Sequence, residues 1–153
     1  MICKPHVTVA AIVARDGKFL LVEEQADGDV VFNQPAGHLE EGESLIQAVM
    51  RETLEETGWH FSPQALLGAY LWQNPRTQIT YLRFAFTGAV QSQEPQRPLD
   101  NGILRTVWMT LEETRQARPR HRSPQVQRCI DDFITGQRYP LSFINELRTD
   151  MVK

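Results

Sequence analysis

Residues 51–58 read RETLEETG, and this stretch lies within the segment GHLEEGESLIQAVMRETLEETGW at positions 37–59. It brings three carboxylates, Glu52, Glu55 and Glu56, into five consecutive positions. In a helix these side chains share one face, because residues three and four positions apart are neighbours. Like charges at that spacing cost a helix about 0.2–0.5 kcal/mol per pair, whereas a divalent cation held between them removes the repulsion. The stretch therefore predicts a helix that carries a metal-dependent phosphate site.

The residues around this helix make the pattern more specific. Five residues separate Gly37 from Glu43, and seven more separate Glu43 from the RExxEExG of residues 51–58. If each of the seven fixed residues had a usage of about 7%, a chance match at one start would have odds on the order of 10⁻⁸. The pattern resembles the signature of the Nudix hydrolases, from which it departs at Thr53, where that family has a large aliphatic side chain. We expect a small packing cost there and unchanged chemistry.

The resemblance implies a set of metal ligands and a reaction. In the family, the residues that match Glu52, Glu55 and Glu56 bind a divalent cation, usually Mg²⁺ or Mn²⁺, and the backbone carbonyl that matches Gly37 is a further ligand. The cation neutralises phosphate oxygens and lowers the pKa of a bound water molecule, which is what hydrolysis of a phosphoanhydride requires. We therefore expect Glu52, Glu55, Glu56 and Arg51 to be the catalytic residues.

The identity of the general base stays open at this point. Glu52 is one candidate, and the others are the two acids of the loop predicted at residues 91–102, Glu94 and Asp100. Acids in surface loops are more commonly solvated side chains without a catalytic role.

Several other side chains near the motif have two interpretations. Arg51 is expected to hold a glutamate in place through a forked hydrogen-bonded pair rather than to touch phosphate. Glu43 either joins that pair or stabilises the start of the helix through its dipole. His38 could contact substrate, but a lone loop histidine is a weak signal. Core packing is expected for each of the three tryptophans, with stacking on a substrate ring as the alternative for one of them: Trp59, Trp72 and Trp108.

The remaining chain reads as alternating strands and helices. Ser44 and Gly58 are expected to cap the motif helix, and a helix over residues 124–135 has apolar residues at helical spacing. A short helix follows Thr110. Residues 7–14 and 19–23 are expected to form a buried hairpin. The further predicted strands are residues 30–32, 66–72, 80–90 and 105–109. This order predicts a mixed sheet between helical layers, and the resemblance sharpens it to the family's α/β/α sandwich with a mixed central sheet.

Length, composition and charge limit the class of protein. At 153 residues the chain suits one domain, residues 1–153. A net charge of -3 provides no general attraction to nucleic acid or anionic membranes, so we expect no DNA or membrane partner. The basic run at residues 115–122 is expected to be a solvated loop with a mild steering role. Cys3 and Cys129 form no zinc-binding pattern. The short apolar run near the N-terminus is interrupted by Thr8 and followed by Arg15-Asp16-Gly17, so it reads as a strand rather than a signal peptide, and a cytoplasmic location is expected.

Three segments outside the motif narrow the expected substrate. NQPAGH at 33–38, RSP at 122–124 and GQRYPL at 136–141 are similar to the NudJ-type phosphatases of the family. That similarity implies a monomer that releases phosphate from nucleoside tri- and diphosphates and from thiamine-type pyrimidine pyrophosphates. ADP-ribose or the 5′ end of RNA is the alternative substrate, because Pro75 stands where some ADP-ribose hydrolases also have a proline. A non-enzymatic nucleotide-sensing domain is a minor alternative, since such domains tend to lose motif glutamates.

Overall fold

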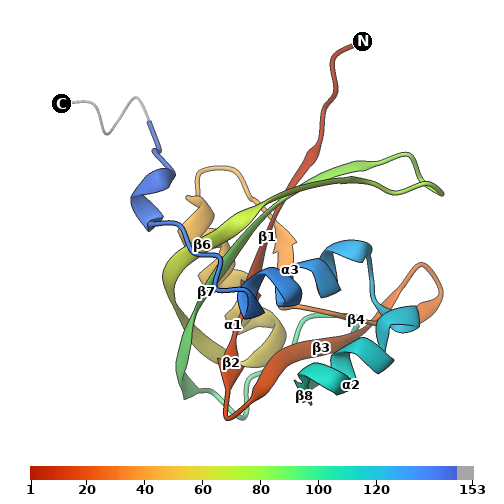
Figure 1. Cartoon of the computed structure of the whole chain (residues 1–153), viewed down its shortest axis with the longest axis vertical. Helices are drawn as coiled ribbons and strands as arrows, with labels where there is room; N and C mark the ends of the chain where they lie inside the picture. The colour runs from red at the N-terminus through yellow and green to blue at the C-terminus, as the bar shows by residue number, and fades with distance from the viewer. Residues whose placement is uncertain (148–153) are drawn as a thin grey trace.

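The computed structural model describes residues 1–147, which form two four-stranded sheets with helices packed around them (Figure 1). The first sheet has the order β5-β1-β7-β6. Its strands β1 and β7 are parallel and its other pairs are antiparallel, so this sheet is mixed, as expected. The bounds of its strands are β1 His6–Ile12, β5 Ala36–His38, β6 Trp59–Gln73 and β7 Thr80–Gln93.

The second sheet is antiparallel and is built around β3. Strand β8 pairs along β3 from Lys18 to Glu24, while β2 and β4 pair with successive parts of β3. The bounds of its strands are β2 Ala14–Arg15, β3 Lys18–Ala26, β4 Asp29–Asn33 and β8 Ile103–Thr110.

The motif helix α1, Leu45–Thr57, begins and ends where its capping residues predict. The Ser44 hydroxyl accepts a hydrogen bond from the backbone of Gln47, whose side chain returns one to the Ser44 backbone. Gly58 ends the helix at φ 73°, a left-handed conformation that glycine adopts without a steric penalty. The other helices are α2 Leu111–Gln116 and α3 Pro124–Ile134, with single 3₁₀ turns η1 Arg118–Arg120 and η2 Leu141–Phe143.

Helices α1 and α3 cover opposite faces of the mixed sheet. Alternate residues of a strand point to opposite faces, and β1 divides its buried residues accordingly. Val9 belongs to a hydrophobic cluster with Val49 of α1, whereas Ala10 belongs to a second cluster with Ile130 of α3. The predicted α/β/α sandwich is therefore confirmed, with the motif helix α1 on one face of the mixed sheet and α3 on the other.

The predicted hairpin over residues 7–14 and 19–23 is wrong in its inner part. Only residues close to the turn pair: Ala14 with Phe19 and Arg15 with Lys18 through β2, and Leu20 donates a backbone hydrogen bond to the Val13 carbonyl at 3.0 Å. Strand β1 instead joins the mixed sheet between β5 and β7. Its residues from Val9 onward are buried on both faces, which suits a central strand between two helical layers.

Strand β6 begins at Trp59, seven positions before the predicted start. The extra length contains Pro63, which lies opposite Gly88 beside a register shift. A proline is tolerated in a strand at such a bulge. The two strands approach so closely here that a Cβ at Gly88 would come within 2.0 Å of the Ser62 carbonyl oxygen. Residues 36–38, where no strand was predicted and His38 was expected in a loop, form the short strand β5.

Thr53, the departure from the family pattern, is fully buried in α1. Its hydroxyl donates to the Val49 carbonyl at 2.7 Å, one turn earlier in the helix. The polar atom is therefore satisfied within the helix, and the exchange leaves no unpaired hydroxyl in the core.

Candidate active site

Helix α1 buries two of its acids at the end of a cleft. Glu52 is 9% exposed and Glu56 is 6% exposed, while Glu55 is partly exposed. Burial disfavours the charged form, and it raises the pKa of Glu52 to about 7 and the pKa of Glu56 to about 9. The backbone N–H of Ala36 on β5 donates to Glu56 Oε1 at 2.8 Å and so holds this carboxylate against the strand.

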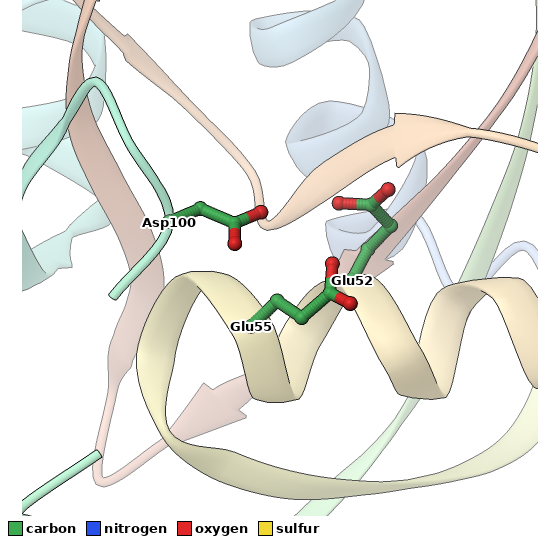
Figure 2. A group of neighbouring side chains, drawn as sticks. All are labelled: Glu52, Glu55 and Asp100. Atoms are coloured by element: carbon green, nitrogen blue, oxygen red, sulfur yellow. The ribbon is translucent and has the colours of Figure 1, made fainter. Parts of the chain in front are cut away.

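A loop acid completes a cluster of carboxylates with α1. Oxygens of Glu52, Glu55 and Asp100 all lie within 4.8 Å of one another. Figure 2 shows the two glutamates rising from α1 and Asp100 approaching from the loop before β8. The Asp100 backbone N–H donates to the Glu55 carbonyl at 3.0 Å, which fixes the loop to the helix. Glu94, the other loop candidate, lies outside the cluster, and its carboxylate contacts His60 at 2.7 Å.

Arg51 makes the predicted forked pair, and its partner is Glu43. Its Nε and NH2 groups donate to the two Glu43 oxygens at 2.9 and 2.7 Å. Its NH1 group donates to Glu52 at 2.8 Å and to Glu55 at 3.1 Å, and NH2 also donates to the His38 carbonyl at 3.0 Å. Hydrogen bonding to Arg51 lowers the pKa of Glu43, which therefore stays ionised. One guanidinium thus links the helix acids to the strand β5.

Gly37 lies directly beneath the Glu52 carboxyl group. A Cβ placed on Gly37 would come within 2.1 Å of Glu52 Cδ, far inside van der Waals contact. The glycine therefore lets the buried acid rest against the strand, and it places the Gly37 backbone at the edge of the carboxylate cluster.

Glu24 is an acid of this site that the sequence did not reveal. It lies on β3, is 8% exposed, and accepts a hydrogen bond from Arg122 at 2.8 Å. Its charge helps to raise the pKa of Glu56. The available signal was an acidic pair, Glu23-Glu24, directly after the apolar run of β3. Strand pairing that brings β3 beside α1 is a long-range contact, which that signal does not contain.

The donor set fits a hard divalent cation. Carboxylate oxygens from α1 and from the Asp100 loop converge on one place, and such oxygens are the ligands that Mg²⁺ prefers. Within residues 1–147, neither Glu56 nor Asp100 pairs with a lysine or arginine. The carboxyl groups therefore outnumber the arginines that pair with them, and a bound cation would favour their ionised forms.

Glu24, Glu52 and Glu56 line a cleft of about 560 Å³. The cleft is also lined by basic and aromatic residues, which are Trp72, Arg76, Tyr81, Arg83, His121 and Arg122. His38 also lines the cleft, so its side chain is placed where it could meet substrate. Part of the predicted basic run is neutralised, because Arg120 and Arg122 pair with Glu23 and Glu24 at 2.9 and 2.8 Å.

The three tryptophans separate into two groups. Trp59 and Trp108 pack edge to face at 6.4 Å against the core cluster around α1, with the Arg15 guanidinium over both rings. Their predicted packing role is confirmed. Trp72 instead lines the cleft and stacks on Tyr81 at 6.0 Å.

No helix within the described part of the chain is long and apolar enough to cross a membrane.

Comparison with known proteins agrees with this geometry. Residues 4–129 match the NUDIX domain. Phosphatase NudJ of Escherichia coli K12 is 42% identical over 150 residues, which cover 98% of this chain and 97% of that protein. A NUDIX hydrolase structure from Nitrosomonas europaea is 50% identical with a TM-score of 0.92, covering 94% of this chain and 98% of that one.

A more distant structure shares the fold alone. The NUDIX domain of Shewanella oneidensis NrtR, in a cocrystal with ADP ribose, is 18% identical with a TM-score of 0.69 and covers 87% of this chain and 90% of that one. The full-length match at 42% identity and the domain match over the carboxylate motif establish the family. The chain belongs to the Nudix hydrolases and is a phosphohydrolase of that family.

Proposed function

We propose that this enzyme hydrolyses phosphoanhydride bonds of small-molecule pyrophosphates with Mg²⁺ as its cofactor and Mn²⁺ as a possible substitute. The observation that supports it is the convergence of Glu52, Glu55 and Asp100 within 4.8 Å, beside the buried Glu56 at one end of the cleft. An excess of carboxylates at a cleft that also contains arginines suits a substrate bound through a cation at one end and through protein cations elsewhere.

The residues that would hold the cation are Glu52, Glu55, Glu56 and the carbonyl of Gly37, with Asp100 at the rim. Bound there, Mg²⁺ supplies positive charge to the phosphate oxygens and lowers the pKa of water. Arg51 then acts as a positioning residue, because its hydrogen bonds to Glu52 and Glu55 fix the direction of both carboxylates.

Asp100 is the general base in this proposal. Glu52 is already engaged, since its Oε1 accepts a hydrogen bond from Arg51 at 2.8 Å. The exposed Asp100 has no hydrogen-bond donor to its carboxylate among residues 1–147 and stands across the cluster from α1. A free, solvated carboxylate can take a proton from water without first losing another partner. Asp100→Asn should therefore lower kcat strongly with little change in the free energy of unfolding.

The substrates we propose are nucleoside tri- and diphosphates and thiamine-type pyrimidine pyrophosphates, with release of phosphate. Support comes from the full-length similarity to a protein named phosphatase NudJ and from a cleft of suitable volume for a ligand of this size. The alternatives are ADP-ribose and the 5′ end of RNA. Pro75 gives little support to ADP-ribose, because it lies in the turn between β6 and β7, where Asn74 accepts hydrogen bonds from Arg76 and Thr77.

The test is release of phosphate, pyrophosphate and nucleoside monophosphate from GTP, GDP, thiamine pyrophosphate, hydroxymethylpyrimidine pyrophosphate and ADP-ribose. Each reaction is run with Mg²⁺ and with chelator. Mg²⁺-dependent phosphate release from the nucleotides and pyrimidine compounds is expected. Exclusive cleavage of ADP-ribose would keep the metal site and overturn the substrate proposal. Tight nucleotide binding without any turnover would favour the sensing domain. A cytoplasmic, monomeric enzyme remains a prediction.

A further inference from the structure

The face of the mixed sheet beneath α3 continues beyond that helix as the floor of the cleft. Ala85 on β7 is buried in the cluster with Ile130 of α3. Tyr81 and Arg83 lie four and two residues earlier on the same strand, so they point to the same face. Trp72 pairs with Tyr81 from the neighbouring strand β6. Apolar residues thus fill most of the part that α3 covers, whereas aromatic and charged residues form the part that lines the cleft.

The aromatic pair on this floor has no role in the hydrophobic core. Trp72 and Tyr81 are both partly exposed, and their rings stack at a centroid distance of 6.0 Å with 21° between planes. Neither belongs to the clusters of hydrophobic residues around α1 and α3. A flat, half-exposed aromatic surface inside a polar cleft is suited to stacking with a heteroaromatic ring.

Arg83 is a buried cation without an anion. Its side chain is 4% exposed and donates to two neutral amides, Gln34 Oε1 at 2.7 Å and Asn33 Oδ1 at 2.9 Å. Its Nε atom has no partner, and no carboxylate pairs with it anywhere in residues 1–147. A guanidinium stays charged in proteins, and burying it without an anion is costly. A ligand anion in the cleft would offset that cost.

The carboxylate cluster, Arg83 and the aromatic pair of Trp72 and Tyr81 occur in a definite order across the strands of the sheet. Gly37, next to the carboxylate cluster, lies on the edge strand β5, and Arg83 lies two strands further on β7. At a strand spacing of about 4.8 Å, their backbones are about 10 Å apart, and the long side chains of Glu52 and Arg83 line the same cleft. Trp72 lies one strand beyond Arg83, on β6. A substrate that follows this order has its cleaved anhydride at the acids, its inner phosphate at Arg83 and its ring at Trp72.

We propose that this floor binds the retained half of the substrate, with a planar heterocycle stacked on Trp72 and Tyr81 and the phosphate attached to it neutralised by Arg83. The direction in which the substrate lies rests on the proposed function. Binding of the retained half itself requires neither a cation nor hydrolysis, so a monophosphate product should bind to metal-free enzyme.

The test measures dissociation constants by calorimetry in chelator for three probes: GMP, ribose 5-phosphate and guanosine. GMP has both the ring and the phosphate, and each of the other two lacks one of them. Trp72→Leu should weaken GMP binding about tenfold or more and leave ribose 5-phosphate unchanged. Leu71→Ala, at an exposed neighbouring position on the other face of β6, is the matched control and should change neither.

Substitution of Arg83 should show the complementary pattern. Arg83→Gln is expected to weaken GMP and ribose 5-phosphate about 30-fold or more and to leave guanosine unchanged. Arg105→Gln is its control, because Arg105 is exposed and pairs with Glu23 in the other sheet. Equal losses for all three probes, or no loss for the phosphates, would overturn the assignment of Arg83.

Asn33→Asp keeps the proposal testable if Arg83→Gln does not fold. The new carboxylate would stand where the Asn33 amide oxygen now accepts from Arg83, so it would give the buried cation an anion of its own. The expected result is a higher Tm together with GMP binding weakened about tenfold or more. A higher Tm with unchanged GMP binding would assign Arg83 a structural role only and refute the proposal.

Failure of the proposed function and failure of this inference have different signatures. If wild-type enzyme binds GMP in chelator but hydrolyses no pyrophosphate, the proposed function fails and the inference stands. If it hydrolyses GDP with Mg²⁺ but GMP binding is unaffected by Trp72→Leu and by the Arg83 and Asn33 variants, the proposed function stands and the inference fails.

Discussion

Gly37→Ala should lower the activity of the enzyme strongly without unfolding it. The new Cβ would come within 2.1 Å of Glu52 Cδ, whereas ordinary contacts begin at 3.4 Å. The Glu52 carboxyl group must therefore withdraw by about 1.3 Å, and a misplacement of about 1 Å at a catalytic group can cost about 100-fold. The backbone of Gly37 has no positive φ, and the clashing atoms are the end of a flexible side chain. The fold should accordingly tolerate alanine.

The expected result is a fall in kcat/KM of about 100-fold, equivalent to about 2.7 kcal/mol, with Tm lowered by only a few degrees. Initial rates with GDP and saturating Mg²⁺, together with thermal unfolding by circular dichroism, measure the two quantities. Gly88→Ala is the matched control. Its Cβ would come equally close, 2.0 Å, to a backbone carbonyl of Ser62 that cannot move aside. It should therefore lower Tm markedly while the residual folded protein keeps its specific activity.

A second substitution tests the cause directly. Glu52→Asp shortens the side chain by one methylene and withdraws the carboxylate by about 1.5 Å, so alanine at Gly37 should cost little in that background. Wild-type kcat/KM for Gly37→Ala would refute the role of this contact. So would full additivity of the two substitutions in a double-mutant cycle.

Three further predictions follow from the same site. Metal-free protein in chelator should lose stability as pH rises from about 5 to 9, because the folded state keeps Glu56 protonated up to a pKa of about 9 whereas the unfolded chain ionises it near 4.5. The Tm increase on adding Mg²⁺ should consequently be larger at pH 9 than at pH 6. A Tm increase that is independent of pH would contradict this prediction. Glu56→Gln should lower kcat by orders of magnitude, yet raise the metal-free Tm at pH 9, since it removes the buried charge; wild-type turnover would disprove its role as a ligand. Arg51→Lys keeps the charge but loses the fork to Glu43, so kcat should fall about 10–100-fold and the KM for Mg²⁺ should rise. Normal dependence of this variant on Mg²⁺ would show that the positioning of Glu52 and Glu55 does not need the guanidinium.

The parts of the structure that the sequence predicts are those with local causes. The bounds of α1 are set by a capping serine and a left-handed glycine, both of which act within a few residues. The shared face of its glutamates follows from helical spacing alone. The position of Arg51 beside the acids predicts a fork to a glutamate, and Glu43, one of whose two expected roles was to join that pair, is the partner.

The parts that the sequence does not predict depend on pairing between distant segments. Asp100 reaches the site because β8 pairs with β3 and its preceding loop bonds to Glu55. Glu24 lies on β3, the partner strand of β8 in the same pairing, and reaches the site from there. The early start of β6 was missed because Pro63 breaks the strand pattern locally, and only the bulge opposite Gly88 accommodates it. Propensity cannot reveal a bulge that depends on its partner strand.

At both ends of the cleft, ionisable side chains lack the opposite charge that would stabilise their ionised form. At one end, burial raises the pKa of Glu52 and Glu56, and their acidic neighbours add to the shift, so ionisation is unfavourable until a cation binds. At the floor, Arg83 is held by two neutral amides although acids line the same cleft. A direct ion pair between the two ends would stabilise the empty protein, but it would occupy the groups that a cation and a phosphate need. Keeping them apart lowers the stability of the free enzyme and leaves that electrostatic energy to be gained when metal and substrate bind together.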